Sequence, residues 1–396
     1  MTALAARTAP ARRLVWIDWL KVLVMLGVFA YHAAQPFVIT SWIISNDERS
    51  LVLSAFAGLG YLFGMPLMFL LAGAASWLAL GQRGIGRYVW LRVQRLAVPL
   101  VVGIALLSPF QSWIGALTRG TQESLPAHVL EFFTEMRFDP TPLWLGIYGY
   151  HLWFLGFLFL YAVISIPVLG WMRGGAGLAA VGRLATLMER PLGLWWPVLP
   201  LIASQLVLRA SFPSYRDWAD FGLWLIFYLI GVAMVADRRI LSALAGRGLR
   251  LVVPALILAA AFIPIALSGA LWQLEGSPRY DAAGLAYAAL RTAVAWCWVV
   301  LAVAIGTRWF DRGERTVRPA AQIVLPFYVL HHPAIVVVAA VVVGWPVGVW
   351  PKYAAILIAS LAMTLLLCEG VRRVPALRGI FGLPRSRAAA LAESAV

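Results

Sequence analysis

The stretch Val15-Trp-Ile-Asp18-Trp-Leu-Lys21-Val-Leu-Val-Met-Leu-Gly-Val-Phe-Ala-Tyr-His32 places three ionisable residues in an otherwise apolar run. On an α-helix, Lys21 and His32 lie within roughly 20° of one another and about 16 Å apart along the axis, with Asp18 on the same stripe. Ionisable side chains inside a membrane helix are costly and are candidates for function by default. The stretch therefore predicts a membrane helix with a functional face.

The composition of the whole chain indicates the same class of protein. Of its 396 residues, 62% are hydrophobic and only 12% are charged, and the mean hydropathy is +0.84, which is too apolar for a soluble globule. The sequence predicts an all-α, polytopic bundle of transmembrane helices. The first run, residues 15–38, is longer than the roughly 7–15 residues of a signal-peptide core and carries charges, so we expect it to be a retained span.

Apolar runs of about twenty residues predict ten spans. They are Val15–Val38, Leu53–Leu80, Leu91–Phe110, Tyr148–Trp171, Leu194–Leu208, Trp218–Val235, Leu251–Leu271, Leu285–Thr307, Ala321–Val343 and Lys352–Val371. With the N-terminus inside, about 23 arginines fall on the cytoplasmic side and roughly 7 basic residues outside, a strong positive-inside bias. We expect both termini in the cytoplasm.

This topology divides the chain into parts with different expected roles. Residues 1–14 form a cytoplasmic segment, residues 15–372 form the membrane domain, and residues 373–396 form a basic, disordered cytoplasmic tail. Within the membrane domain, residues 111–147 form a long outside connection, which is the best place for a lid over an external substrate.

The charge balance and the cysteines exclude several classes of function. The 32 Lys and Arg residues exceed the 17 Asp and Glu residues, but they lie in short clusters between apolar runs, as orienting loop charges do. Nucleic acid is therefore not an expected partner. Cys297 and Cys368 lie in apolar runs without ligand spacing, which indicates neither a disulfide framework nor a metal site.

Three histidine positions are candidates for chemistry. His32 has a side chain suited to general base catalysis, although an interfacial histidine near a helix end would look the same. The motif Tyr328-Val-Leu-His331-His332-Pro333 lies within an expected span, where histidines need partners, so function is favoured there. His151 stands beside Trp153 near an expected helix end, and anchoring at the membrane interface explains it slightly better.

Several cations are further candidates. Arg92 and Arg95 share one face of a helix and suit phosphate recognition, although in isolation they are better explained as orienting charges. Lys21 can pair with Asp18 or reach the inner headgroups. Arg291 lies within an expected span and should face a polar cavity. Arg13, one of three arginines before the first span, is retained as a further candidate.

Taken together, these motifs resemble acyltransferase family 3, a family of integral-membrane acyltransferases that includes O-antigen acetyltransferases and glucan succinyltransferases. Five segments carry the resemblance, in the family's order. They are Asp18-Trp-Leu-Lys21 with His32; Gly64-Met-Pro-Leu-Met-Phe-Leu-Leu-Ala-Gly73; Arg92-Val-Gln-Arg95-Leu-Ala-Val-Pro99; His151-Leu-Trp-Phe; and Tyr328-Val-Leu-His331-His-Pro333.

The resemblance implies transfer of an acyl group, acetyl or succinyl, from cytoplasmic acyl-CoA to a hydroxyl of a glycan or lipid-linked glycan across a bacterial inner membrane. It also implies His32, with Asp18 and His331, as catalytic residues, and Lys21, Arg92 and Arg95 as residues on the CoA side. No metal or haem is expected. Lys21 replaces the family's usual arginine and so loses a bidentate fork, and Ala72 replaces its usual serine.

Two other classes of protein remain open from the residues alone. A transporter or flippase for a glycan or lipid intermediate would also use intramembrane histidine and arginine. A haem-binding bundle could use His32, His151 and His331, but their predicted depths argue against pairing the mid-span His331 with the other two. For an acyltransferase, two roles of His32 remain open. It could act as the general base on the acceptor hydroxyl, or it could carry the acyl group transiently.

Overall fold

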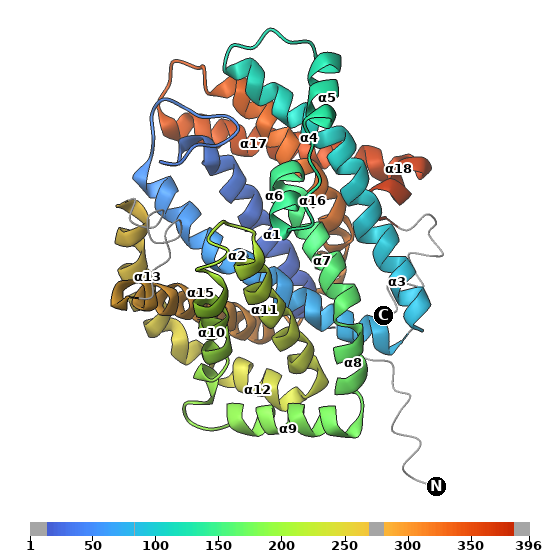
Figure 1. The fold of residues 1–396 in the computed structure, drawn as a ribbon, viewed down its shortest axis with the longest axis vertical. Coiled ribbons are helices and arrows are strands. Elements are labelled where there is room, and N and C mark those ends of the chain that lie inside the picture. The colour runs from blue at the N-terminus through green and yellow to red at the C-terminus, as the bar shows by residue number, and fades with distance from the viewer. Residues whose placement is uncertain (1–13, 83, 269–280, 384–396) are drawn as a thin grey trace.

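The structure, a computed structural model, describes residues 14–82, 84–268 and 281–383, and it is a bundle of α-helices without strands over these residues (Figure 1). The helices are α1 (Val15–Ala34), α2 (Leu51–Gly81), α3 (Ile85–Arg92), α4 (Val98–Thr118), α5 (Leu125–Thr134), α6 (Pro142–Tyr148), α7 (Trp153–Ile164), α8 (Ile166–Met172), α9 (Gly175–Met188), α10 (Val198–Leu208), α11 (Trp218–Ala236), α12 (Arg238–Arg247), α13 (Val252–Leu267), α15 (Ala282–Trp309), α16 (Glu314–Val342), α17 (Val349–Arg373) and α18 (Pro375–Ile380). The expected all-α membrane bundle is confirmed.

Eight helical segments of the described chain are long and apolar enough to cross a membrane, and the bent pair α7–α8 makes nine if it counts as one span. The sequence predicted ten. The expected span Leu194–Leu208 contains α10, which has 11 residues and is about 16 Å long, too short for a hydrocarbon core of about 30 Å. The placement of both termini in the cytoplasm stays a prediction.

Two segments outside the expected membrane spans contain helices. The expected outside connection, residues 111–147, contains the end of α4, all of α5 and most of α6. The start of the expected disordered tail forms α18, which packs against the junction of α3 and α4. Arg13 and residues 384–396 lie outside the described residues. Helix α2 also runs unbroken through Pro66.

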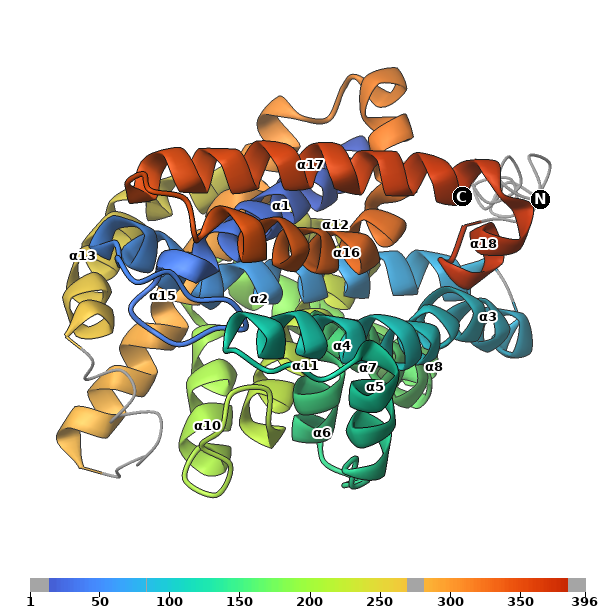
Figure 2. The same cartoon turned by 90° about the horizontal axis from the view of Figure 1, so that it is seen from above.

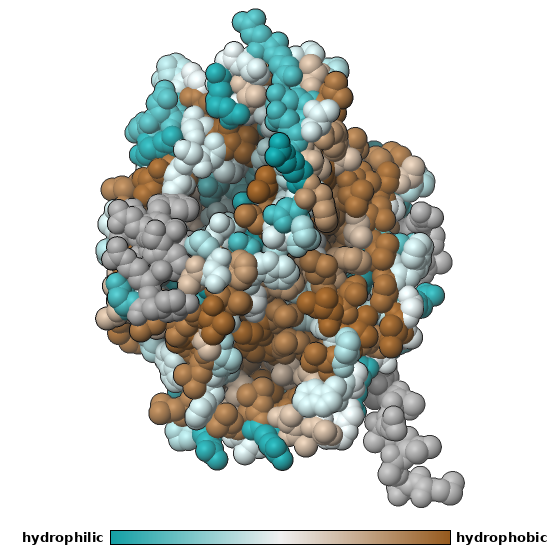
Figure 3. Space-filling view, viewed as in Figure 1, coloured by the Kyte–Doolittle hydropathy of each residue, from teal (hydrophilic) through white to brown (hydrophobic). Residues whose placement is uncertain are grey.

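The surface has the character expected of a protein that lies in a bilayer. In Figure 3, apolar side chains predominate across the middle of the visible face, and hydrophilic ones gather toward the top and the bottom. Large apolar side chains such as Val101, Ile358 and Leu366 are 65–73% exposed within the chain itself. Helices with so much apolar exposure are stable where lipid covers them.

The centre of the bundle consists of α1, α2, α11, α15 and α16, with α17 lying along α16 (Figure 2). Helices α2 and α11 approach each other at two glycines. A Cβ on Gly73 would lie 1.9 Å from the Tyr228 carbonyl oxygen, and a Cβ on Gly231 would lie 1.9 Å from the Leu70 carbonyl oxygen. Small residues at helix crossings allow such backbone contact.

Replacing Gly73 with alanine is therefore expected to force α2 and α11 apart and to lower the melting temperature of the detergent-solubilised protein. The clash is with backbone, which cannot rotate away, so the loss should fall in the range of about 1–3 kcal/mol found for overpacked cores. Gly370→Ala is the matched control, because a Cβ there meets nothing within 4 Å. Equal melting temperatures for the two variants would contradict the close crossing.

Candidate active site

Helices α1 and α16 lie side by side and run in the same direction. Near their starts, the Trp19 indole Nε1 donates a hydrogen bond to the Arg312 carbonyl, 2.9 Å away. Further along, His32 Nδ1 and His331 Nε2 are 3.0 Å apart and form a second hydrogen bond. Both histidines lie 17 residues after the first residue of their helices. Parallel packing therefore brings them to the same depth.

The hydrogen bonds of the two rings assign their tautomers. His331 Nδ1 lies 2.6 Å from the Tyr328 carbonyl oxygen, which can only accept, so this nitrogen carries the proton. His331 Nε2 is then an acceptor and takes the proton that His32 Nδ1 donates. His32 Nε2 is left with its lone pair. We call this chain of hydrogen bonds, from the Tyr328 carbonyl through His331 to His32, the relay. The relay orients His32 as a neutral imidazole with a basic nitrogen.

Pro333 explains how His151 joins the same cluster. Proline has no N–H, so the helical partner of the carbonyl four residues earlier, on Val329, is missing. The His151 ring fills this gap, because its Nε2 donates to the Val329 carbonyl at 3.0 Å. The Tyr328 hydroxyl donates in turn to the His151 carbonyl. His151 is only 4% exposed, so it is not the interfacial anchor that the sequence favoured.

His332 completes this group, and we call His32, His151, His331 and His332 the histidine cluster. The His332 ring stacks on His151 at a centroid distance of 4.5 Å and lies 4.8 Å from His32. Its Nδ1 donates to the side-chain oxygen of Gln111. The Gln111 amide nitrogen donates to the Leu107 carbonyl at 2.9 Å, which fixes the orientation of the amide. Gln111 was not among the residues predicted from the sequence.

A cavity of about 780 Å³ reaches the histidine cluster. His32, His151 and His332 line it, whereas His331 does not and acts behind His32. Toward the N-terminal end of α1 the wall becomes apolar, with Leu20, Val24 and Gly27 of α1 as lining residues. Leu20 and His32 are twelve positions apart on the helix, which corresponds to about 18 Å. The cavity is thus an apolar channel that ends at a polar site.

A smaller pocket of about 230 Å³ adjoins the polar end of this cavity. The two share Tyr31, Gln35, Tyr61 and Tyr215 as lining residues. Burial raises the pKa of the Tyr215 hydroxyl, so it stays protonated and able to donate. The pocket combines aromatic faces with hydroxyl and amide groups, which is a suitable lining for a polar ligand with many hydroxyls.

The other charged candidates lie apart from the histidine cluster. Asp18 is 14 residues before His32, about 21 Å along the helix, and it pairs with Lys21 at 3.9 Å. Arg92 donates to Ser76 at 3.2 Å, and Arg95 lies on the π-helical turn between α3 and α4. None of these four charged residues lines the cavity. Lys21 directly follows Leu20, at the apolar end of the channel.

Arg291 does not face the cavity as the sequence predicted. It is 6% exposed and lies in a buried network, where it donates to Asp220 at 3.1 Å and to Gln205 at 3.0 Å. Its third contact, to the Tyr61 hydroxyl at 3.2 Å, links the network to the cavity wall. The cation among the described lining residues is instead Arg216, which the sequence suggested only as a loop charge.

The sequence predicted that His331 lies at a different membrane depth from His32 and His151, which argued against a shared haem. This prediction of depth was wrong. The His331 ring centroid lies 5.1 Å from that of His32 and 5.4 Å from that of His151. A haem between His32 and His331 is nevertheless disfavoured by the fit. Axial nitrogens on opposite faces of one metal stand about 4 Å apart for bonds of about 2 Å, whereas these nitrogens are hydrogen-bonded at 3.0 Å.

One group of possible metal ligands lies outside the cavity, on and before α5. The ligand atoms of Glu123, His128 and Glu131 lie within 4.8 Å of one another. Both ring nitrogens of His128 already have protein partners, since Nδ1 lies 2.9 Å from Glu123 and Nε2 lies 3.0 Å from Ser112. These hydrogen bonds account for the arrangement of the three side chains.

Residues 14–369 match the family described as "Acyltransferase domain", acyltransferase family 3. The match covers nearly all of the described chain, and the chain belongs to this family of membrane acyltransferases. It is an integral membrane protein. The resemblance inferred from the sequence motifs is thereby confirmed.

Among curated proteins, the chain is similar to "Glucans biosynthesis protein C" of Salmonella paratyphi B, Salmonella enteritidis PT4 and Salmonella heidelberg. In each case the identity is 25% over 235 residues, which is 59% of this chain and 51% of the relative. The match thus spans about half the length of these relatives. No solved structure matches the chain.

Proposed function

We propose that this protein transfers an acyl group, acetyl or succinyl, from acyl-CoA to a hydroxyl of a glycan or lipid-linked glycan, in a bacterial plasma membrane. The observation that carries the proposal is the relay from the Tyr328 carbonyl through His331 to His32, which leaves His32 Nε2 basic at the end of the cavity. A neutral, oriented imidazole of this kind is what removal of a hydroxyl proton requires.

In the proposed reaction, His32 Nε2 takes the proton of the acceptor hydroxyl while the hydroxyl oxygen attacks the carbonyl carbon of the thioester. The carbon–sulfur bond of the tetrahedral intermediate then breaks, and CoA leaves as a thiolate that is protonated by the His32 imidazolium. His331 holds the ring orientation and polarises it, which makes His331 a positioning residue. An acyl group carried transiently on Nε2 would use the same lone pair and would show ping-pong kinetics.

The two ends of the cavity suit the two substrates. The apolar channel from Leu20 to His32 suits the extended arm of an acyl thioester. Lys21, which follows Leu20 in the sequence, is proposed to attract an anionic group of the donor from outside the cavity. The smaller pocket, with Tyr31, Tyr61 and Tyr215, suits an acceptor sugar beside the base. Arg92 and Arg95 are proposed only as an outer electrostatic contribution to donor binding, since they lie outside the cavity.

Purified protein in lipid nanodiscs, given acyl-CoA and a glycan acceptor, tests this function. An enzyme releases free CoA in proportion to the acylated acceptor found by mass spectrometry. A transporter or flippase binds or moves the glycan and releases no CoA. Release of CoA without acylated acceptor would indicate hydrolysis and would contradict the proposed transfer.

Replacing Gly27 with leucine is expected to fill the apolar channel and to raise the KM for acyl-CoA by about tenfold or more, which corresponds to roughly 1.4 kcal/mol of lost binding. Gly27 lines the cavity, and a Cβ there meets nothing within 4 Å, so the new side chain enters open space. Leu26→Phe is the matched control, because Leu26 is 43% exposed and is not among the residues that line the cavity. An unchanged KM in Gly27→Leu would contradict donor binding in the channel.

A further inference from the structure

Arg216 has an unusual backbone conformation between α10 and α11. Its φ is 70°, in the left-handed region that non-glycine residues rarely adopt, at a typical cost of about 1–3 kcal/mol. The conformation is held in place, because the Arg216 backbone N–H donates to the Asp220 carboxylate at 2.9 Å. Such strain persists only where the surrounding structure enforces it.

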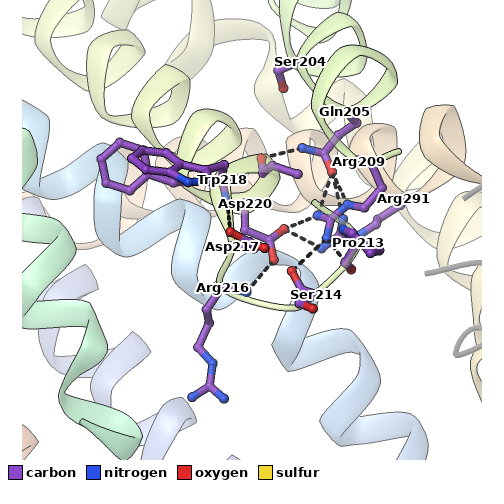
Figure 4. Close-up of polar contacts among 12 residues, drawn as sticks. Ser204, Gln205, Arg209, Pro213, Ser214, Arg216, Asp217, Trp218, Asp220 and Arg291 are labelled. Atoms are coloured by element: carbon purple, nitrogen blue, oxygen red, sulfur yellow. Dashed lines mark hydrogen bonds and ion pairs between the residues drawn. The ribbon is translucent and has the colours of Figure 1, made fainter. Parts of the chain in front are cut away.

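A buried network fixes Asp220 itself. The carboxylate is 0% exposed and accepts from the guanidinium groups of Arg209 and Arg291. Gln205 accepts from the same two arginines, at 2.8 Å and 3.0 Å. In Figure 4, Arg209 and Arg291 converge on Asp220, whereas the side chain of Arg216 extends away from the network. The network therefore anchors the Arg216 backbone and leaves its side chain for another use.

The side chain of Arg216 runs along the wall of the main cavity. Its guanidinium carbon lies 5.0 Å from the Tyr215 ring centroid, and Nη1 lies 3.4 Å from the Tyr150 carbonyl oxygen. A Cβ on Gly146 would lie 2.9 Å from Nε, so a larger residue at position 146 would displace the Arg216 side chain. Tyr150 has a φ of 49°, so two left-handed residues meet at this wall.

The guanidinium lacks a carboxylate partner among the described residues. No described carboxylate oxygen lies within 4 Å of its nitrogen atoms. Its Nε is buried and has no hydrogen-bond partner. Among the described residues, no acidic one lines the cavity that Arg216 shares with His32 and His332. A fixed cation opposes the protonation of a base in the same cavity, so proton transfer to His32 is favoured when a negative charge forms in the cavity at the same time.

We propose that Arg216 is a catalytic residue whose guanidinium stabilises the oxyanion formed during acyl transfer. The inference rests on the proposed function. As the acceptor oxygen bonds to the thioester carbon, the carbonyl π electrons move to the carbonyl oxygen, and the proton moves to His32. The new negative charge then lies beside Arg216 at the moment when His32 becomes positive. When the carbon–sulfur bond breaks, the carbonyl reforms and the charge leaves with the CoA sulfur.

Arg216→Gly tests the proposal with little risk to folding, because glycine adopts a positive φ without strain. We expect kcat to fall by about 10²–10³, as when one oxyanion donor is removed, with the KM for acyl-CoA nearly unchanged. Arg216→Lys should recover part of the loss, and added guanidinium ion at millimolar concentration should rescue Arg216→Gly. Arg183→Met, which removes an exposed charge from α9, is the control and should retain full activity.

Three results would overturn the assignment. One is an Arg216→Gly protein with a wild-type kcat. Another is a raised KM with an unchanged kcat, or a loss of activity seen only with acyl donors that carry a free carboxylate. Either result would make Arg216 a substrate-binding residue instead. The third is a loss of kcat that guanidinium ion does not rescue and that appears together with a lowered melting temperature. If the wild-type protein itself releases no CoA, the proposed function fails, whereas an active Arg216→Gly protein refutes this inference alone.

Discussion

Replacing His32 with alanine is expected to abolish measurable acyl transfer while the protein remains folded and inserted. The variant removes the nitrogen that takes the acceptor proton, and general base catalysis contributes about 10²–10⁴ to a rate. His32→Asn is the closer substitution, because its amide nitrogen can replace Nδ1 as the donor to His331 but offers no basic nitrogen. Both variants should lose CoA release and acceptor acylation together.

The control for this prediction is His128→Ala, which removes a histidine outside the cavity. It should keep its activity and its gel-filtration profile. The activity of His331→Ala should lie between those of the wild-type protein and His32→Ala, because the variant keeps the His32 base but lacks the group that orients it. A His32→Asn protein with a substantial fraction of wild-type activity would show that the base is elsewhere in the histidine cluster, with His332 as the first residue to test.

The second large effect is expected on stability, from Asp220→Ala. The substitution leaves Arg209 and Arg291 buried next to each other without their carboxylate. Breaking a buried ion-pair network in this way costs about 3–5 kcal/mol. Unfolding of the purified protein in mixed detergent micelles, followed at increasing SDS fraction, measures the loss. Because Asp220 also holds the Arg216 backbone, activity should fall in the fraction that stays folded.

Asp237→Ala is the matched control for this stability prediction. Asp237 caps α12 and pairs with Arg239 in an exposed setting, so its loss should cost only about 0.5–2 kcal/mol. If Asp220→Ala costs no more than Asp237→Ala, the buried network contributes little, and its role in holding Arg216 would have to be abandoned.

Much of the histidine cluster could be predicted from local sequence signals. His32 and the pair His331-His332 stand out because ionisable residues interrupt apolar runs, and the proline at 333 marks a carbonyl that needs a new partner. The expected depths failed because the ninth span was taken to begin at Ala321, whereas α16 begins at Glu314, seven residues earlier. With the correct start, His32 and His331 lie equally far along their helices.

The remaining parts of the site depend on contacts that one sequence does not reveal. Arg216 lies in a short connection that resembles any charged loop, and its importance follows from the buried Arg209–Asp220–Arg291 network. Gln111 matters only because α4 continues past the expected end of its span and packs beside α16. Asp18 and Lys21 pair with each other near the start of α1, and the length of the helix keeps both away from His32.

The most direct test of the central claim compares the glycans and glycolipids of cells that produce the wild-type protein with those of cells that produce His32→Asn at equal membrane levels. Mass spectrometry should find an acetyl or succinyl increment on a glycan or lipid-linked glycan in the first cells and its loss in the second. If acylated species are equally abundant in both, His32 is not the catalytic base, and the central claim is contradicted.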